Sequence, residues 1–147
     1  MKEVEVIEEK ILQRVEQVKD VKKDFFKLWR SKESLEKHIT KRLELSHIKD
    51  EDDYIKKTLE CIIDADEYIL AKHQNSWNNL CYNQKKEWAV VFNESGEIMT
   101  SYKVDPDKKS FEELHKEVGG KIEKGSVNER VKRAFKRLRD RYKKLGE

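Results

Sequence analysis

The chain has 147 residues, of which 36% are apolar and 43% are charged, and its formal net charge is +3. This length suits a single domain with a modest core, and the three Trp, five Tyr and five Phe residues argue against a wholly disordered chain. No run of apolar residues is long enough to span a membrane, and no secretory signal pattern opens the sequence. We therefore expect a cytoplasmic protein in which Cys61 and Cys81 are reduced thiols.

The first predicted element is one long amphipathic helix over residues 2–29. Its apolar residues recur at intervals of three and four and form a narrow seam, namely Val4, Ile7, Ile11, Val18, Val21, Phe25 and Leu28. This seam fits a second copy of the chain, the C-terminal helix or a partner protein. Ser31 is the predicted N-cap of a second helix over residues 32–46, on which His38 and Arg42 lie four residues apart.

A third helix is predicted over residues 53–63, directly after the acidic run 50–53. We expect these carboxylates to stabilise the helix N-terminus rather than to bind a metal ion. The pattern then changes to short segments rich in aromatic and β-branched residues, which predict strands over residues 67–72, 79–83, 86–93 and 97–104.

The turn sequence Asn-Glu-Ser-Gly at residues 93–96 makes the last two predicted strands a hairpin. The first of these should direct Trp88, Val90 and Phe92 to one face and Ala89 and Val91 to the other. On the last strand, alternation predicts one face that carries Ile98, Thr100, Tyr102 and Val104.

Two capping boxes predict helices in the remaining sequence. Ser110 and Glu113 begin a short helix that Gly119 and Gly120 close, and Ser126 with Glu129 begins the last helix. Residues 120–126 are accordingly interpreted as a helix end followed by a helix start, not as a phosphate-binding loop. The predicted fold class is α+β, with N-terminal helices, a small four-stranded antiparallel sheet and C-terminal helices. We divide it into an amphipathic helical extension (1–30), an α+β core (31–104) and C-terminal helices with a basic face (105–147).

The charge of the chain is distributed unevenly. Residues 121–147 carry eleven Lys and Arg against four Asp and Glu, a net charge of +7, whereas the other residues sum to −4. A basic C-terminal helix on a slightly acidic body suggests contact with a nucleic acid or another polyanion. A solvated basic helix face is the alternative interpretation.

Metal chemistry is not indicated by the sequence. No two of the histidines are spaced as a metal-binding pair, and Glu112 with His115 supplies only half of a di-iron motif; the four are His38, His47, His73 and His115. The residue types present suit RNA cleavage by general acid–base catalysis. That reaction needs a base, an acid and cations, and histidine and arginine supply these roles at neutral pH.

Three short motifs carry a resemblance to a known superfamily. They are residues 38–42 (His-Ile-Thr-Lys-Arg), 88–92 (Trp-Ala-Val-Val-Phe) and 100–102 (Thr-Ser-Tyr). Helices with such a His–Arg element, followed by a four-stranded sheet with these last strands, resemble the barnase–EndoU–colicin–RelE superfamily, most closely its phage-associated members. The similarity covers residues 35–104. Here Leu43 follows Arg42, where many relatives have a second His, and the next histidine is His47.

The resemblance implies a metal-independent endoribonuclease, often a toxin, that needs no cofactor. It implies that His38 is the acid or base, that Arg42 or Lys41 holds the phosphate, and that Thr100 and Tyr102 supply hydroxyls. Lys41 and Lys103, together with the basic last helix through Arg133 and Arg137, are the predicted substrate-binding residues. RNA is the expected partner, and an inhibitor protein or a second copy of the chain is an expected partner of the 2–29 helix.

Other interpretations remain open at this point. His38 can simply pack within its helix, Arg42 can pair with Glu36 or Glu44, and Thr100 and Tyr102 are common in strands. The protein can therefore also be a non-catalytic module that binds nucleic acid or protein, or an assembly protein that dimerises through its first helix.

Overall fold

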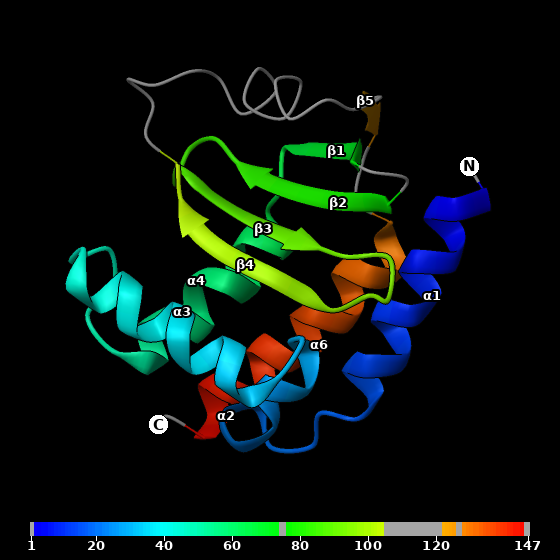
Figure 1. Ribbon diagram of the computed structural model, residues 1–147. Helices are drawn as coiled ribbons and strands as arrows, with labels where there is room; N and C mark the ends of the chain where they lie inside the picture. The colour runs from blue at the N-terminus through cyan, green and yellow to red at the C-terminus, as the bar shows by residue number, and fades with distance from the viewer. Residues whose placement is uncertain (1, 74–75, 105–121, 126–127, 146–147) are drawn as a thin grey trace.

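The computed structural model of the chain describes residues 2–73, 76–104, 122–125 and 128–145. In this part of the chain, helices pack beneath one face of an antiparallel sheet (Figure 1), which confirms the α+β class. The helices are α1 (Lys2–Glu16), α2 (Val21–Asp24), the 3-10 helix η1 (Phe25–Leu28), α3 (Lys32–Glu44), α4 (Glu51–Ile63) and α6 (Glu129–Leu145). None of these described helices is long and apolar enough to cross a membrane.

The strands of the described residues form one five-stranded sheet in the order β4-β3-β2-β1-β5. They are β1 (Glu67–His73), β2 (Ser76–Asn83), β3 (Trp88–Phe92), β4 (Ile98–Lys103) and β5 (Ile122–Gly125). The first four confirm the predicted strands. The helical interpretation of residues 120–126 is wrong for the described residues 122–125, because β5 pairs with β1 from Tyr68↔Gly125 to Ala71↔Ile122. Such a short strand depends on a distant partner for its hydrogen bonds, so local sequence does not reveal it.

The described residues do not include the short helix that was predicted after Ser110. They also do not include Ser126, which was expected to begin the last helix.

The single helix predicted over residues 2–29 is wrong, since α1 ends at Glu16 and the chain turns before α2. Two aspartates cause the break. Asp20 caps α2 by accepting a hydrogen bond from the Lys23 amide at 3.1 Å, and the Asp24 carboxylate accepts from the amides of Lys19 and Asp20. These side chains give the backbone an alternative to helical hydrogen bonds. The predicted seam residues from Ile7 to Leu28, on both sides of the break, are nevertheless buried.

Of the three partners that the sequence left open for the first helix, α1 contacts the C-terminal helix. The amide of Asn128 donates to Glu8 at 2.7 Å, and Arg130 pairs with Glu9 at 2.6 Å. One hydrophobic cluster joins α1, α4, the sheet and α6. The division into the parts 1–30, 31–104 and 105–147 stays a prediction. The hydrophobic core contains residues of all three parts.

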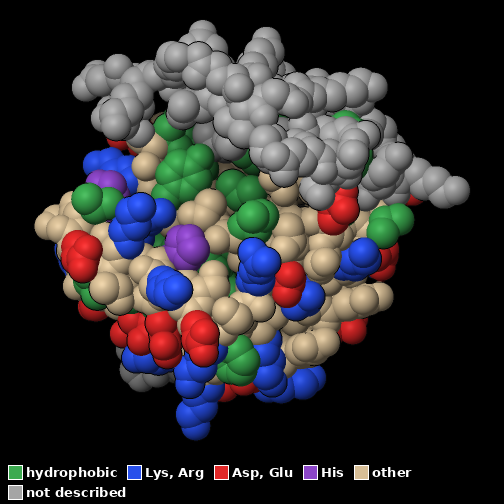
Figure 2. Space-filling view, viewed as in Figure 1, with side chains coloured by type: hydrophobic (Ala, Val, Ile, Leu, Met, Phe, Trp, Pro, Cys, Tyr) green, Lys and Arg blue, Asp and Glu red, His purple; other side chains and the backbone are tan. Residues whose placement is uncertain are grey.

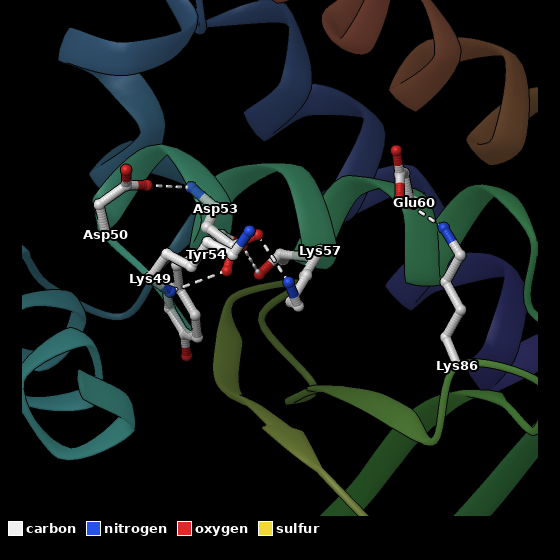
Figure 3. Close-up of polar contacts among 8 residues, drawn as sticks. Lys49, Asp50, Asp53, Tyr54, Lys57, Glu60 and Lys86 are labelled. Carbon is white, nitrogen blue, oxygen red and sulfur yellow. Dashed lines mark hydrogen bonds and ion pairs between the residues drawn. The ribbon is translucent and has the colours of Figure 1, made fainter. Parts of the chain in front are cut away.

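Helix α4 lies against the sheet and begins at the acidic run. Asp50 caps it by accepting from the Asp53 amide at 2.8 Å, and Asp53 in turn accepts from the Lys49 amide and from Lys57 Nζ (Figure 3). Burial acts to raise the pKa of Asp53, but the hydrogen bonds from Lys57 and Lys49 outweigh it and lower that pKa. The prediction that these carboxylates serve a helix terminus is confirmed.

The predicted hairpin between β3 and β4 is present, and its turn rests on α1. Arg14 Nε donates to the Ser95 carbonyl at 3.0 Å, and the Gly96 amide closes the turn on the Asn93 carbonyl. Gly96 has a φ of +75°, and a Cβ at this position would lie 2.7 Å from the backbone nitrogen of Ile11. Only glycine therefore allows this approach.

The sheet has an apolar cluster on each face. Trp88, Val90 and Phe92 point to the helices and Ala89 and Val91 to the other face, as predicted. The predicted face of β4 is wrong for one residue. Phe92 pairs with Ile98 but Val91 pairs with Thr100, so Met99 is an extra residue in a bulge. Because a one-residue shift reverses the faces, Ile98 points to the helices whereas Tyr102 and Val104 belong to the opposite cluster.

Candidate functional site

A group of polar residues meets where the C-terminal half of α3 lies against β4, the edge strand of the sheet. We call it the α3–β4 corner, and its members are Arg42, Tyr102, His47 and Lys103, with His38 one helical turn before Arg42 on α3. Figure 2 shows histidine side chains among lysines and arginines on the face of the molecule that carries α3 and β4.

Arg42 is the centre of the corner. Its side chain crosses from α3 to β4, where Nε donates to the Ser101 carbonyl at 3.2 Å. The guanidinium carbon lies 5.9 Å from the centroid of the Tyr102 ring, a cation–π geometry. Arg42 is only 9% exposed, so little of the guanidinium reaches solvent. The structure thus brings Arg42 to Tyr102 rather than to a solvent-exposed carboxylate on α3.

A buried hydrogen-bond network fixes the carbonyl that holds Arg42. Tyr54 Oη donates to the same Ser101 carbonyl at 2.7 Å, and Trp88 Nε1 donates to Ser101 Oγ at 2.8 Å. Thr58 Oγ1 and Ser101 Oγ share a further hydrogen bond of 2.7 Å. Because every member is buried, the network holds β4 firmly against α4. Sequence reasoning missed Tyr54 because it carries no motif.

His38 is held in one orientation. Its Nδ1 lies 2.7 Å from the Ser34 carbonyl, and since a carbonyl only accepts, Nδ1 is the donor. In the neutral ring Nε2 therefore carries the free lone pair. The ring packs against Trp29, with 5.3 Å between centroids, and Trp29 forms a β-bridge to Ile98 at the edge of β4. The imidazole is half-buried and oriented, as a general base must be.

His47 reaches the corner through an unusual helix end. Ser46 has a φ of +59° and is the left-handed residue of a Schellman motif, in which the His47 amide donates to the Arg42 carbonyl at 3.0 Å. Burial lowers the pKa of His47, and the positive charges of Lys103 and Arg42 lower it further. Sequence reasoning did not assign His47 to the site, because glycine, the usual signal for this turn, is absent.

The predicted hydroxyl residues differ in their relation to α3. Burial raises the pKa of Tyr102 to about 12, although Arg42 acts in the opposite direction, so the phenol keeps its proton at neutral pH. Thr100 pairs with Val91 and points away from the helices. Among the contacts of the described residues, none joins Thr100 to His38 or Arg42. Lys41 and Lys103 are both exposed beside the corner.

Arg133 and Arg137 do not lie at the corner. They line a separate groove between α1 and α6, which we call the α1–α6 groove and define by Val15, Lys19, Arg130, Arg133, Arg137 and Arg141. The predicted substrate-binding residues are therefore divided between two places.

The charges of the corner favour an anion. Arg42 and Lys103 are cationic, and both histidines gain positive charge on protonation. Within the described residues, no group of three or more His, Cys, Asp or Glu side chains is placed to hold a metal ion. The cations can orient a phosphate, His38 Nε2 can accept a proton and the Tyr102 phenol can donate one. Among the contacts of the described residues, however, none joins His38 to Tyr102.

A family model described as "Uncharacterised protein aq_aa01" matches residues 19–143. The chain belongs to this family. The aq_aa01 match contains the whole α3–β4 corner and the arginines of α6, whereas α1 precedes it. No curated protein and no solved structure matches the chain.

Proposed function

We propose that the protein is a metal-independent endoribonuclease that acts at the α3–β4 corner by general acid–base catalysis. The observation that carries the proposal is the oriented His38, one helical turn before an arginine that is held against Ser101 and Tyr102. A distant membership of the barnase–EndoU–colicin–RelE superfamily belongs to the same proposal. A His–Arg helix packed against β4, an edge strand that carries a tyrosine, supports it.

In the proposed reaction, His38 Nε2 takes the proton of the ribose 2′-hydroxyl. The 2′-oxygen attacks the adjacent phosphorus, the bond to the 5′-oxygen breaks, and the products are a 2′,3′-cyclic phosphate and a 5′-hydroxyl. Tyr102 supplies the proton for the leaving oxygen, because its raised pKa keeps the phenol protonated until that stage.

Cations beside these groups stabilise the phosphorane. Arg42 supplies a fixed charge, and the exposed Lys103 and Lys41 move to meet the phosphate. An incoming phosphate offsets the positive charges of Lys103 and Arg42, so the pKa of His47 rises when RNA binds and the ring can hold a proton there. Binding through phosphates falls steeply with increasing salt.

The test is to incubate the purified protein with single-stranded RNA in the presence of EDTA. We expect fragments that end in a cyclic phosphate. His38→Asn keeps a donor for the Ser34 carbonyl but cannot accept the proton, so it should reduce cleavage by about 10²-fold or more. Lys37→Gln, on an exposed position next to it, is the matched control and should cleave as the parent does. Full activity in His38→Asn, or no cleavage of any RNA, would exclude the proposed reaction.

A second candidate is an RNA-binding module without catalysis. Arg42 favours it, because a guanidinium that is nearly buried and already bonded to Ser101 has less freedom to follow a reacting phosphate. In that case the protein would shift RNA in a native gel and leave its length unchanged on a denaturing gel.

We place the protein in the cytoplasm, since Cys61 and Cys81 are free, buried thiols and a reducing compartment preserves them. An inhibitor protein or a second copy of the chain would meet the outer side of α1, because Ile7 and Ile11 on its apolar side are only 3% exposed.

A further inference from the structure

The α1–α6 groove has a volume of about 540 Å³ and lies apart from the α3–β4 corner. No residue of α3 or β4 is among the described residues that line it. In Figure 1, α3 and α1 lie at opposite ends of the helical layer, and α6 crosses the layer from the side of α1. The groove therefore needs a ligand of its own, or a ligand long enough to reach both places.

The charges in the groove are not balanced. Its lining contains Lys19 and four arginines but only one carboxylate, that of Glu16. Arg130 pairs with Glu9, and Arg141 donates to the carbonyl of Val18 at 3.3 Å. Arg133 and Arg137, in contrast, are exposed, and no carboxylate of the described residues pairs with either of them.

Two of the exposed arginines of the groove are close neighbours on α6. Arg133 and Arg137 are four residues apart on α6, and like charges at this spacing repel each other. A groove that gathers guanidinium groups with no carboxylate partner among the described residues is suited to a ligand that supplies negative charge.

The geometry of the row indicates the kind of anion. Arg130, Arg133, Arg137 and Arg141 follow one another at intervals of three or four residues, and a helix rises about 1.5 Å per residue. The guanidinium groups therefore form a line along α6, as a linear chain of anions requires. Arginine forks match phosphate oxygens, and the aliphatic side chains of Leu12 and Val15 provide an apolar floor for the sugars.

We propose that the α1–α6 groove is a second RNA site, which binds successive phosphates of a single strand whose other part lies at the α3–β4 corner. The proposal rests on the proposed function in that RNA is the shared ligand. The groove binds the backbone without reading the sequence, and it favours long substrates over short ones.

The experiment compares two double variants of equal charge. Arg133→Gln with Arg137→Gln removes both unpaired groups, and Lys136→Gln with Lys143→Gln removes two exposed cations of α6 that do not line the groove. Binding of a long, fluorescently labelled single-stranded RNA is measured by anisotropy over a range of salt concentrations. Circular dichroism melting verifies that both variants fold.

We expect the groove variant to bind the long RNA about tenfold more weakly at low salt, with a salt slope reduced by about 1.4 because two phosphate contacts are lost. The control variant should keep the parent slope within about 0.3. Cleavage of a dinucleotide, which reaches only the corner, should be the same in all three proteins.

Equal losses in the two double variants would overturn the proposal, since they would indicate a diffuse field rather than a groove. Polyglutamate that competes as well as RNA of the same length would also overturn it, in favour of an acidic protein ligand. If the protein cleaves no RNA, the proposed reaction fails, but the anisotropy comparison still decides the groove.

Discussion

The protein places the arginine side chain in two contrasting environments, buried at Arg42 and exposed at Arg133 and Arg137. Arg42 is 9% exposed, and it is bonded to the Ser101 carbonyl and packed over Tyr102. Arg133 and Arg137 are exposed in the α1–α6 groove and have no carboxylate partner among the described residues. Burial removes the water around a guanidinium, and fixed contacts within the protein must offset the hydration free energy that is lost. An exposed guanidinium keeps its hydration until a ligand binds. We infer that Arg42 is a structural part of the fold, so that its charge acts from a fixed position, whereas Arg133 and Arg137 are free to follow a ligand.

The largest expected effect is that of Arg42→Ala on stability. This change removes the bond to Ser101 and the buried stem of the side chain, so the free energy of unfolding should fall by about 2–3 kcal/mol. Arg133→Ala is the matched control and should stay within about 0.5 kcal/mol of the parent. Urea unfolding measures both. Equal effects of the two changes would remove the distinction between the two regions.

A smaller effect is expected at Ser46, which precedes His47. A left-handed φ of +59° is unfavourable for serine and easy for glycine, so Ser46→Gly should raise the free energy of unfolding by about 0.5–1 kcal/mol. Ser95→Gly, in an exposed turn without a positive φ, should bring no gain. Thermal unfolding of the two variants decides the matter, and a loss of stability in Ser46→Gly would show that the turn stores no strain.

The next expectation concerns pH. The pKa of His47 is lowered by burial and by Lys103 and Arg42, so the unfolded chain takes up this proton first as the pH falls. The stability that neutral His47 contributes is thus complete above its ordinary pKa of 6.5 and decreases as the pH falls through the lower, folded value. Lys103→Gln should raise the pKa of His47 and flatten this decrease. NMR titration of the imidazole measures the shift, and Lys49→Gln, an exposed charge nearby, should leave that pKa in place.

The smallest effect on the stability of the protein is expected when two exposed arginines of the α1–α6 groove are replaced. Replacing both Arg133 and Arg137 by glutamine removes a repulsive pair, so the free energy of unfolding should stay the same or rise by less than about 0.5 kcal/mol. Urea unfolding at low and high salt tests this, because the gain should disappear when salt screens the repulsion. A substantial loss of stability would mean that these arginines, like Arg42, belong to the fold.

Local signals in the sequence predicted local structure well. The cap at Ser31 and the turn at residues 93–96 depend on neighbours within a few residues, and each lies where the sequence places it. The acidic run was correctly assigned to a helix N-terminus, although α4 begins at Glu51 rather than at residue 53. Asp20 was also a local signal, but the apolar spacing on both sides of it continues without a break. That regular spacing led to the prediction of one helix where the structure has three.

The rest depends on contacts that the sequence does not display. The bulge at Met99 changes the side to which Ile98 points, and no glycine or proline marks it. The strand β5 exists through its pairing with β1. The spacing of His38 and Arg42 was visible in the sequence, but the approach of His47 depends on a left-handed serine, which is uncommon.

The contact between the β3–β4 turn and α1 has a consequence for the order of folding. Arg14 and Ser95 are 81 residues apart, and Gly96 fits against the backbone of Ile11 only when the hairpin is complete. Closing so long a loop is slow, so α1 should dock after the hairpin has formed. A nascent chain would then acquire one wall of its basic groove at the end of maturation, after the corner between α3 and β4 is in place.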